Sequence, residues 1–331
     1  MTTASAKNLT AFTAICVFVL SLAPMVLVTG CSKGATTTTT APAETTVTTT
    51  QPAGTSTTVT TEAETTTTTT VFPPTLSHEE TDSRLVYAGT WKSIDATSAS
   101  GKTLVVADAS GCSMTVRFYG TGASWIAKTS PAYGQATVAV DGGEPKTVDL
   151  YSKSTVWKKK VWESGSLSLG DHKVVIAWTG KKTTGATAAN IDIDAMVITG
   201  VMTGTYEQDA SKLKYSGTWK KTSSGVASGG SCITADASGA SVTVRFTGVR
   251  LVWIARTGTD YGHAKVTVDG AQSKTVDLYA TTTKTGQKVF DTGLLSMGTH
   301  TVKIAWLGTK TAASTGDTIA VDAFEVTGTL K

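Results

Sequence analysis

The sequence predicts an all-β protein in which two tandem β-sandwich domains follow a disordered, threonine-rich stalk. First, residues 85–200 align with residues 213–328 without a gap, at a constant offset of 128 residues, and 58 of the 116 aligned pairs are identical. Second, each copy alternates apolar and polar residues in short runs, without a sustained 3.6-residue apolar period. Third, threonine makes up 22 of the 45 residues in 32–76, and apolar residues are few. Such a segment cannot offset the entropy lost on ordering by burying a core.

The period of 128 residues is too long for a solenoid repeat and matches the size of a whole domain. We call residues 85–200 repeat 1 and residues 213–328 repeat 2. The expected organisation has four parts. These are a signal peptide (1–30), the stalk (31–80), the first β-sandwich module (81–201) and the second module (202–331).

The strand pattern is clear in repeat 1. Residues 113–120 (SMTVRFYG) alternate, and residues 136–151 form an alternating hairpin around Asp141-Gly142, a dipeptide typical of a tight turn. Residues 172–178 (HKVVIAW) and 190–200 (NIDIDAMVITG) predict two more strands. About nine short strands per copy, separated by Gly, Ser and Thr turns, favour a β-sandwich.

The order of these motifs, YSGTW, ADASGASVTVRFTG, WIA, TVDLY and VDAFEV in repeat 2, resembles the galactose-binding-like jelly roll. It is similar in particular to the sugar-binding modules attached to bacterial surface proteins and polysaccharide hydrolases. The resemblance covers both repeats and implies a jelly-roll fold with a carbohydrate ligand. Many modules of this kind carry calcium. One jelly roll serves many ligands, so the resemblance alone does not name the sugar.

The N-terminus has the features of a secretory signal: Lys7 precedes an apolar run that ends in Val28-Thr29-Gly30-Cys31. This ending resembles the lipobox of bacterial lipoproteins, in which the cysteine becomes the lipid-bearing N-terminus. We therefore expect lipidation at Cys31 and a location at the cell surface, with the lipid in the membrane. A plain transmembrane anchor is the alternative. The stalk is expected to be either O-glycosylated or an unmodified linker.

The composition limits which classes of binding partner are expected. A net charge of +4 and a pI near 8.7 are mild and do not indicate nucleic acid. Cys112 and Cys232 do not occupy equivalent positions in the repeats. We expect two buried, unpaired thiols, since cysteine packs as a small hydrophobe. A disulfide joining the repeats is the alternative.

The sequence shows no catalytic signature, so we expect a protein that is not an enzyme and needs no cofactor. There is no G-x-S-x-G elbow and no H-E-x-x-H motif. His172 and His300 begin strands, where a structural hydrogen bond is expected. Asp194 and Asp322 share strand parity with core residues. Each is expected to hold a neighbouring loop, with a structural calcium ion as the alternative.

Sugar binding requires an aromatic ring beside a few polar groups. Both repeats place a cation and a tyrosine in the same loop. The candidate ligand-binding residues are Trp91, Lys128, Tyr133, Trp219, Arg256 and Tyr261. The tyrosines could instead cover the edge of the core. Trp125 and Trp253 lie in apolar runs and are expected to be core residues.

One candidate occurs in repeat 1 alone. Trp157 is followed by Lys158, Lys159 and Lys160, whereas repeat 2 has Thr285 opposite the tryptophan. An exposed tryptophan among lysines could bind an anionic polymer such as teichoic acid. A basic, solvated loop is the alternative.

These observations favour a non-catalytic surface lipoprotein that binds glycans or cell-wall polysaccharide through two duplicated modules. The first alternative is an adhesion or structural protein whose partner is a surface protein. The second alternative is an uncharacterised hydrolase on a sandwich scaffold.

Overall fold

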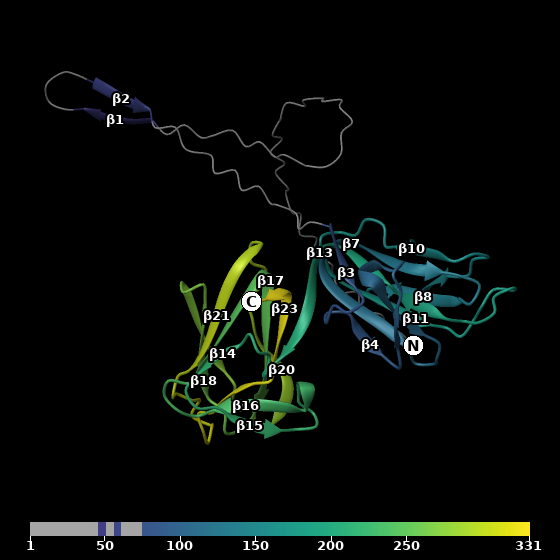
Figure 1. Ribbon diagram of the computed structural model, residues 1–331. Helices are drawn as coiled ribbons and strands as arrows, with labels where there is room; N and C mark the ends of the chain where they lie inside the picture. The colour runs from purple at the N-terminus through teal and green to yellow at the C-terminus, as the bar shows by residue number, and fades with distance from the viewer. Residues whose placement is uncertain (1–45, 51–55, 61–74) are drawn as a thin grey trace, which may run out of the picture. The chain divides into compact units, whose positions relative to one another are not determined.

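The computed structural model describes residues 46–50, 56–60 and 75–331 (Figure 1). The described residues form β-strands and two short 3₁₀ turns, with no α-helix among them. The prediction of an all-β sandwich fold is confirmed. None of the described segments is a helix long and apolar enough to cross a membrane.

The chain divides into two compact units, residues 1–69 and 70–331. In the first unit, β1 (Thr46–Thr50) pairs antiparallel with β2 (Ser56–Thr60). These ten residues differ from the disorder expected for the stalk. Threonine is β-branched and favours extended backbone, which accounts for the pairing of two threonine-rich runs.

Repeat 1 contains a large and a small sheet. In the large sheet the order is β3–β13–β7–β11–β8–β9, and β4 and β10 also pair with β7. Its strands are β3 (Thr75–Glu79), β4 (Val86–Ala88), β7 (Ser113–Thr129), β8 (Gln135–Val140), β9 (Lys146–Asp149), β10 (Val156–Glu163), β11 (Gly170–Trp178) and β13 (Ala195–Glu207). The small sheet has the order β5–β6–β12. Its strands are β5 (Lys92–Asp95), β6 (Thr103–Ala107) and β12 (Ile191–Ile193).

Repeat 2 forms the same strands in the same order. Its large sheet contains β14 (Lys214–Ser216), β17 (Ser241–Thr257), β18 (His263–Val268), β19 (Gln272–Asp277), β20 (Lys284–Asp291), β21 (Gly298–Trp306) and β23 (Ala323–Leu330). Its small sheet contains β15 (Lys220–Ser223), β16 (Ser231–Ala235) and β22 (Ile319–Val321).

Strand β13 belongs to both repeats. Residues 195–199 pair with β3 and β7, and residues 203–207 pair with β23. The second half of β13 lies 128 residues after β3 and takes the place in repeat 2 that β3 has in repeat 1. One continuous strand therefore closes the first sheet and opens the second.

Gly200 lies at the centre of β13, where the backbone irregularity separates its two halves. A Cβ atom on its neighbour Gly120 would lie only 2.2 Å from the carbonyl oxygen of Thr199. Gly248 and Gly328 make the same close approach in repeat 2. The two paired backbones can approach this closely only because neither glycine carries a side chain.

Each repeat has its own hydrophobic cluster. Trp125 and Trp253 are fully buried at the centres of these clusters, which confirms their predicted core role. Cys112 and Cys232 are buried, free thiols, as the sequence analysis expected.

The Asp141-Gly142 turn has the left-handed backbone of a tight hairpin, with φ values of 53° and 72°. The Asp141 carboxylate accepts a bond from the Lys173 N–H (2.7 Å) and pairs with Nδ1 of His172 (2.7 Å). Nε2 of His172 lies 2.8 Å from the Ser168 carbonyl oxygen. Since both ring nitrogens face acceptors, the imidazolium form satisfies both bonds. The predicted structural role of His172 is confirmed.

The ionisation of His172 should make stability depend on pH. Burial lowers the pKa of His172, but the bonds to Asp141 and Ser168 outweigh burial and raise it above the ordinary 6.5. The stabilisation is therefore complete below pH 6.5 and is lost as the pH rises through the raised pKa. We expect His172→Gln to cost about 1 kcal/mol below pH 6.5, because Asp141 is partly solvent-screened. Urea unfolding across a pH series measures this difference, and a difference that grows with pH would contradict it.

Candidate functional site

Three side chains of repeat 1 that are separated in sequence meet at the end of β7. The Lys128 ammonium lies 4.9 Å from the ring centroid of Tyr133 and 4.7 Å from that of Trp157. Lys128 ends the long alternation of β7, Tyr133 follows in the next turn, and Trp157 comes from β10. Two aromatic rings therefore hold one cation, an arrangement that fixes the ammonium position.

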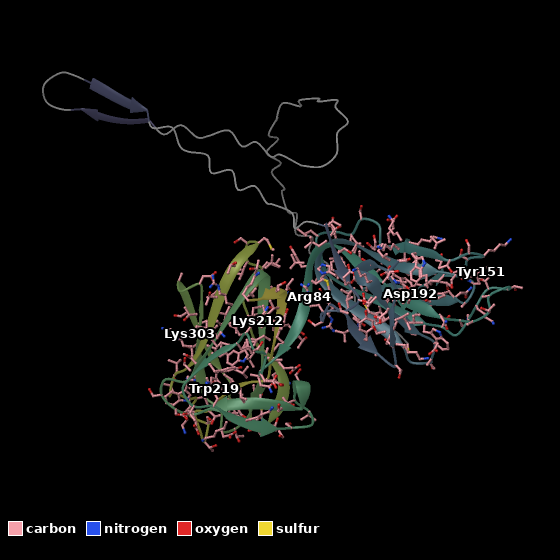
Figure 2. The ribbon with its side chains drawn as sticks, viewed as in Figure 1. Arg84, Tyr151, Asp192, Lys212, Trp219 and Lys303 are labelled. Atoms are coloured by element: carbon pink, nitrogen blue, oxygen red, sulfur yellow. The ribbon has the colours of Figure 1, made fainter. Side chains whose placement is uncertain are left out.

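Asp192, labelled in Figure 2, is fully buried and is hydrogen-bonded to Lys128. Its carboxylate accepts bonds from the Lys128 backbone N–H at 3.0 and 3.2 Å. Burial raises the pKa of Asp192 to about 7, against the opposing effects of the Lys128 N–H and Tyr133. We call Lys128, Tyr133, Trp157 and Asp192 the Lys128 cluster.

Sequence reasoning missed Asp192. A signal was present, because repeat 2 has Ala320 at this position within an otherwise similar apolar strand. A carboxylate among core residues needs hydrogen-bond donors, and the backbone N–H of Lys128 on β7 is the donor here.

Tyr133 and Tyr261 are each only 3% exposed. The stacking role considered for them is therefore not available to a sugar at the surface. Burial raises the pKa of Tyr261 to about 12, and burial together with Asp192 raises that of Tyr133 further. Both tyrosines act as packing beneath the loop, with Tyr133 supporting Lys128.

Lys158 has a left-handed backbone, with φ of 52°, and repeat 2 has Gly286 at this position with φ of 66°. A non-glycine residue in this region carries strain of roughly 1–2 kcal/mol. Lys158, Lys159 and Lys160 are exposed, and Lys160 forms an ion pair with Glu163. Trp157, the remaining residue of the candidate anionic-polymer patch, is half-buried rather than exposed as expected.

The equivalent place in repeat 2 is chemically different. Arg256 replaces Lys128, while Thr285 and Ala320 stand where repeat 1 has Trp157 and Asp192. Nε of Arg256 is buried and makes no hydrogen bond to the residues the structure describes. Burial raises the pKa of the Cys232 thiol, and the nearby Arg256 guanidinium opposes this effect. The two loops cannot bind the same ligand in the same way.

Trp91 and Trp219 lie in a different part of each repeat, at the turn after β4 or β14. Each indole N–H donates to the carbonyl oxygen of the last residue of the preceding strand, Ala88 at 2.9 Å and Ser216 at 3.0 Å. Each ring packs edge-on against a tyrosine at 5.2 Å. A hollow of about 480 Å³ borders Trp219, which is labelled in Figure 2. The predicted ligand residues therefore form separate groups rather than one site.

Buried carboxylates cluster where β3 meets the start of β13. Ser100 donates from its hydroxyl to Glu79 (2.9 Å) and from its backbone N–H to Asp194 (2.7 Å). The second oxygen of each carboxylate is buried and has no hydrogen-bond partner in the described part of the chain. Burial, with the charges of Glu79 and Glu80, raises the pKa of Asp194 to about 6.

Repeat 2 keeps this arrangement. Glu207 accepts a bond from the Ser228 hydroxyl (2.7 Å), and Asp322 accepts one from the Gly286 N–H (3.1 Å). One oxygen of each is again buried without a partner among the described residues.

These unpartnered carboxylate oxygens are of the chemical type that calcium prefers, but each pair supplies only two carboxylates. No group of three or more His, Cys, Asp or Glu side chains that could hold a metal occurs within residues 75–331. Glu79 with Asp194, and Glu207 with Asp322, would hold the ion, and backbone carbonyls or water would complete the shell. A bound calcium would neutralise each carboxylate pair and tie the 3₁₀ turn to the sheet.

No family model matches the chain. A curated relative from Flavonifractor plautii, "A type blood alpha-D-galactosamine galactosaminidase", is 26% identical over 237 residues. The match covers 70% of this chain and 21% of the relative, so the chain spans about a fifth of that protein's length.

Similar solved structures are also carbohydrate-active or carbohydrate-binding proteins by name. A family 35 carbohydrate-binding module from Clostridium thermocellum is 16% identical, with 37% of this chain and 96% of that chain covered and a TM-score of 0.28. A Paenibacillus xanthan lyase is 16% identical, with 76% and 26% covered and a TM-score of 0.29. An exo-beta-1,3-galactanase from Phanerochaete chrysosporium is 18% identical, with 37% and 29% covered and a TM-score of 0.27.

The expectation that the chain is not an enzyme is contradicted by the curated relative, whose name is that of a galactosaminidase. Motif searches missed this relationship because they test for particular catalytic arrangements, and carboxylate-based glycoside hydrolysis needs no short sequence motif. The predicted lipidation site Cys31 lies outside the described residues.

Calcium should stabilise the protein if the paired carboxylates bind it. We expect saturating CaCl₂ to raise the Tm of chelator-treated protein by several degrees, since a ligand at 100 times its Kd contributes about 2.7 kcal/mol. Asp194→Asn and Asp322→Asn should each reduce this shift. Asp108→Asn, at an exposed position, serves as the control. An unchanged Tm with no calcium detected by elemental analysis would contradict the assignment.

Proposed function

We propose that the chain binds glycans and that the Lys128 cluster of repeat 1 is the principal site. The observation that carries the proposal is the convergence of Trp157, the fixed Lys128 ammonium and buried Asp192 at one end of the sheet. A pyranose offers an apolar C–H face to an aromatic ring and hydroxyls to nearby polar groups. Trp157 and Lys128 supply these two kinds of contact.

Preorganisation supports this site. The Lys128 ammonium contacts two rings, and its backbone N–H is bound to Asp192, so little side-chain freedom is lost on binding. The strained backbone of Lys158 also supports a binding site here. Strain that glycine would relieve persists where the side chain has a use, and Gly286 shows that glycine suits this position.

The name of the curated relative supports a ligand class, an α-linked galactosamine. We propose a glycan that ends in such a sugar. The Lys128 ammonium would donate to its hydroxyls, and Trp157 would contact its ring face.

We propose that repeat 2 contributes a second, different contact. Arg256 offers a planar cation there in place of Lys128, while Thr285 and Ala320 replace Trp157 and Asp192. Planar guanidinium suits paired oxygens such as vicinal hydroxyls or a carboxylate. Two weak sites on one chain gain affinity when both reach the same polymer.

Surface display on a lipid anchor at Cys31 is part of the proposal. The lipobox-like sequence supports the anchor, and the threonine-rich segment would carry the two repeats away from the membrane. The alternative to glycan binding is a protein that binds another protein at the cell surface.

Hydrolysis of the bound glycan is a second candidate function, which the name of the relative favours. Release of galactosamine from an α-galactosaminide by the purified chain would establish it. Binding and hydrolysis are separable, since the binding proposal concerns affinity alone.

Exchanging one residue between the repeats tests the site. We expect Trp157→Thr, which copies Thr285 of repeat 2, to weaken binding of an α-galactosaminide at least tenfold, because the stacking surface is lost. Trp162→Phe, which copies Phe290, removes a core-packed indole and should leave affinity within about twofold. Isothermal titration calorimetry measures both variants.

Equal weakening by the two substitutions would indicate a general loss of packing and contradict the assignment. Unchanged affinity in Trp157→Thr would place the sugar elsewhere and would also contradict the assignment.

A further inference from the structure

The outer face of the large sheet in repeat 2 carries a group of cations that the glycan site does not use. Lys214 on β14 and Lys303 on β21 both lie directly opposite Thr243 on the central strand β17. Opposite residues of antiparallel strands share a face, and buried Val242 and Val244 flank Thr243. The two lysines therefore project to solvent on either side of a threonine, with their Cα atoms about 10 Å apart.

Arg245 lies two residues further along β17, opposite Thr301 on β21, and Lys265 on β18 lies opposite Ala305. All four cations are exposed, and none forms a salt bridge with a described residue. We call Lys214, Arg245, Lys265 and Lys303 the basic face. Figure 2 labels Lys303 on this sheet.

Repeat 1 provides an internal comparison at the same four positions. It has Val86, Arg117, Thr137 and Val175 where repeat 2 has the basic face. Three of the four cations are therefore particular to repeat 2, although half of all aligned residues are identical. Repeat 1 also has Asp171 where repeat 2 has Thr299, so this face loses an acid as it gains lysines.

The corresponding face of repeat 1 is engaged by repeat 2. Arg117 pairs with Glu325 at 3.7 Å, and Asp171 accepts a bond from Arg250 at 2.9 Å. The basic face could not accept another copy of repeat 2 in this way. Thr299 offers no carboxylate to an equivalent of Arg250, and the added lysines would repel that arginine.

A hollow of about 690 Å³ lies on this face. Lys212, Lys214, Arg245 and Lys331 border it with threonines between them, and no acidic side chain lines it. The Lys212 ammonium donates one hydrogen bond to the Leu330 carbonyl oxygen at 2.8 Å, which leaves fewer of its N–H groups for a ligand. Asp269 approaches from the β18–β19 turn, but its carboxylate is bound to His300 and to the Thr301 N–H.

We infer that the basic face binds an anionic polysaccharide, one that carries carboxylate or sulfate groups along its chain. The cations would pair with these groups, and the threonine hydroxyls would exchange hydrogen bonds with sugar hydroxyls. A protein partner fits less well, because the described side chains that border the hollow are cations and threonines, without an aromatic or aliphatic anchor among them. This surface is distinct from the Lys128 cluster and does not depend on the proposed function.

Binding to defined polymers tests the inference. We expect the full chain to bind polygalacturonate, heparin or both, and not neutral dextran, with affinity that falls as NaCl rises. The two anionic polymers separate carboxylate from sulfate recognition. The triple variant Lys214→Val, Lys265→Thr, Lys303→Val gives this face the residues of repeat 1. It should lose at least tenfold in affinity while its Tm and its α-galactosaminide affinity stay unchanged.

A matched control removes the same charge elsewhere. Lys181→Thr, Lys182→Thr and Lys310→Thr together alter three exposed loop lysines, and this variant should keep its affinity within about twofold. Equal loss in both triple variants would show unspecific attraction and overturn the inference. Equally tight binding to poly-glutamate or polyphosphate would also overturn it, as would no binding to either polysaccharide.

Discussion

The continuity of strand β13 is the constraint on which the rest of the structure depends. Its first half completes the large sheet of repeat 1 and its second half begins that of repeat 2. The strand also sets the position of the carboxylates, since Asp194 immediately precedes it and Glu207 ends it. Gly120 and Gly200 approach closely at the register shift between the two halves of the strand. A side chain at either glycine would therefore disturb both repeats at once.

The differences between the two repeats indicate where function lies. The hairpin turns, the hydrogen bonds between histidine and the turn aspartate, and the buried tryptophans recur with almost the same geometry. A shared framework requires this recurrence. The changes instead gather at two surfaces. Around Lys128, repeat 1 gains a tryptophan, a strained lysine and a buried carboxylate, and on the sheet face repeat 2 gains three lysines. The lysines among these changes are exposed, so core packing does not require them, and the proposed recognition of different chemical groups accounts for them.

Local pattern was enough to predict the framework but not the site. Alternation and the Asp141-Gly142 turn predicted the strands, because these depend on neighbouring residues. The meeting of Lys128 with Trp157 depends on the pairing of β7 with β10, which bulges make irregular and no local pattern reveals. The choice between a ligand role and a packing role for Tyr133 was open for the same reason. Its burial depends on segments that are distant in the sequence. Asp192 was overlooked because a lone acid in an apolar strand has no periodic signature.

The central claim is that an α-galactosaminide contacts Trp157 at the end of β7. The chain has eight tryptophans, and replacing them with 5-fluorotryptophan gives each a ¹⁹F resonance that substitution can assign. Titration with the sugar should shift the Trp157 resonance and leave that of buried Trp125 unmoved. A shift confined to Trp219, or no shift of Trp157 when binding is saturated, would contradict the account.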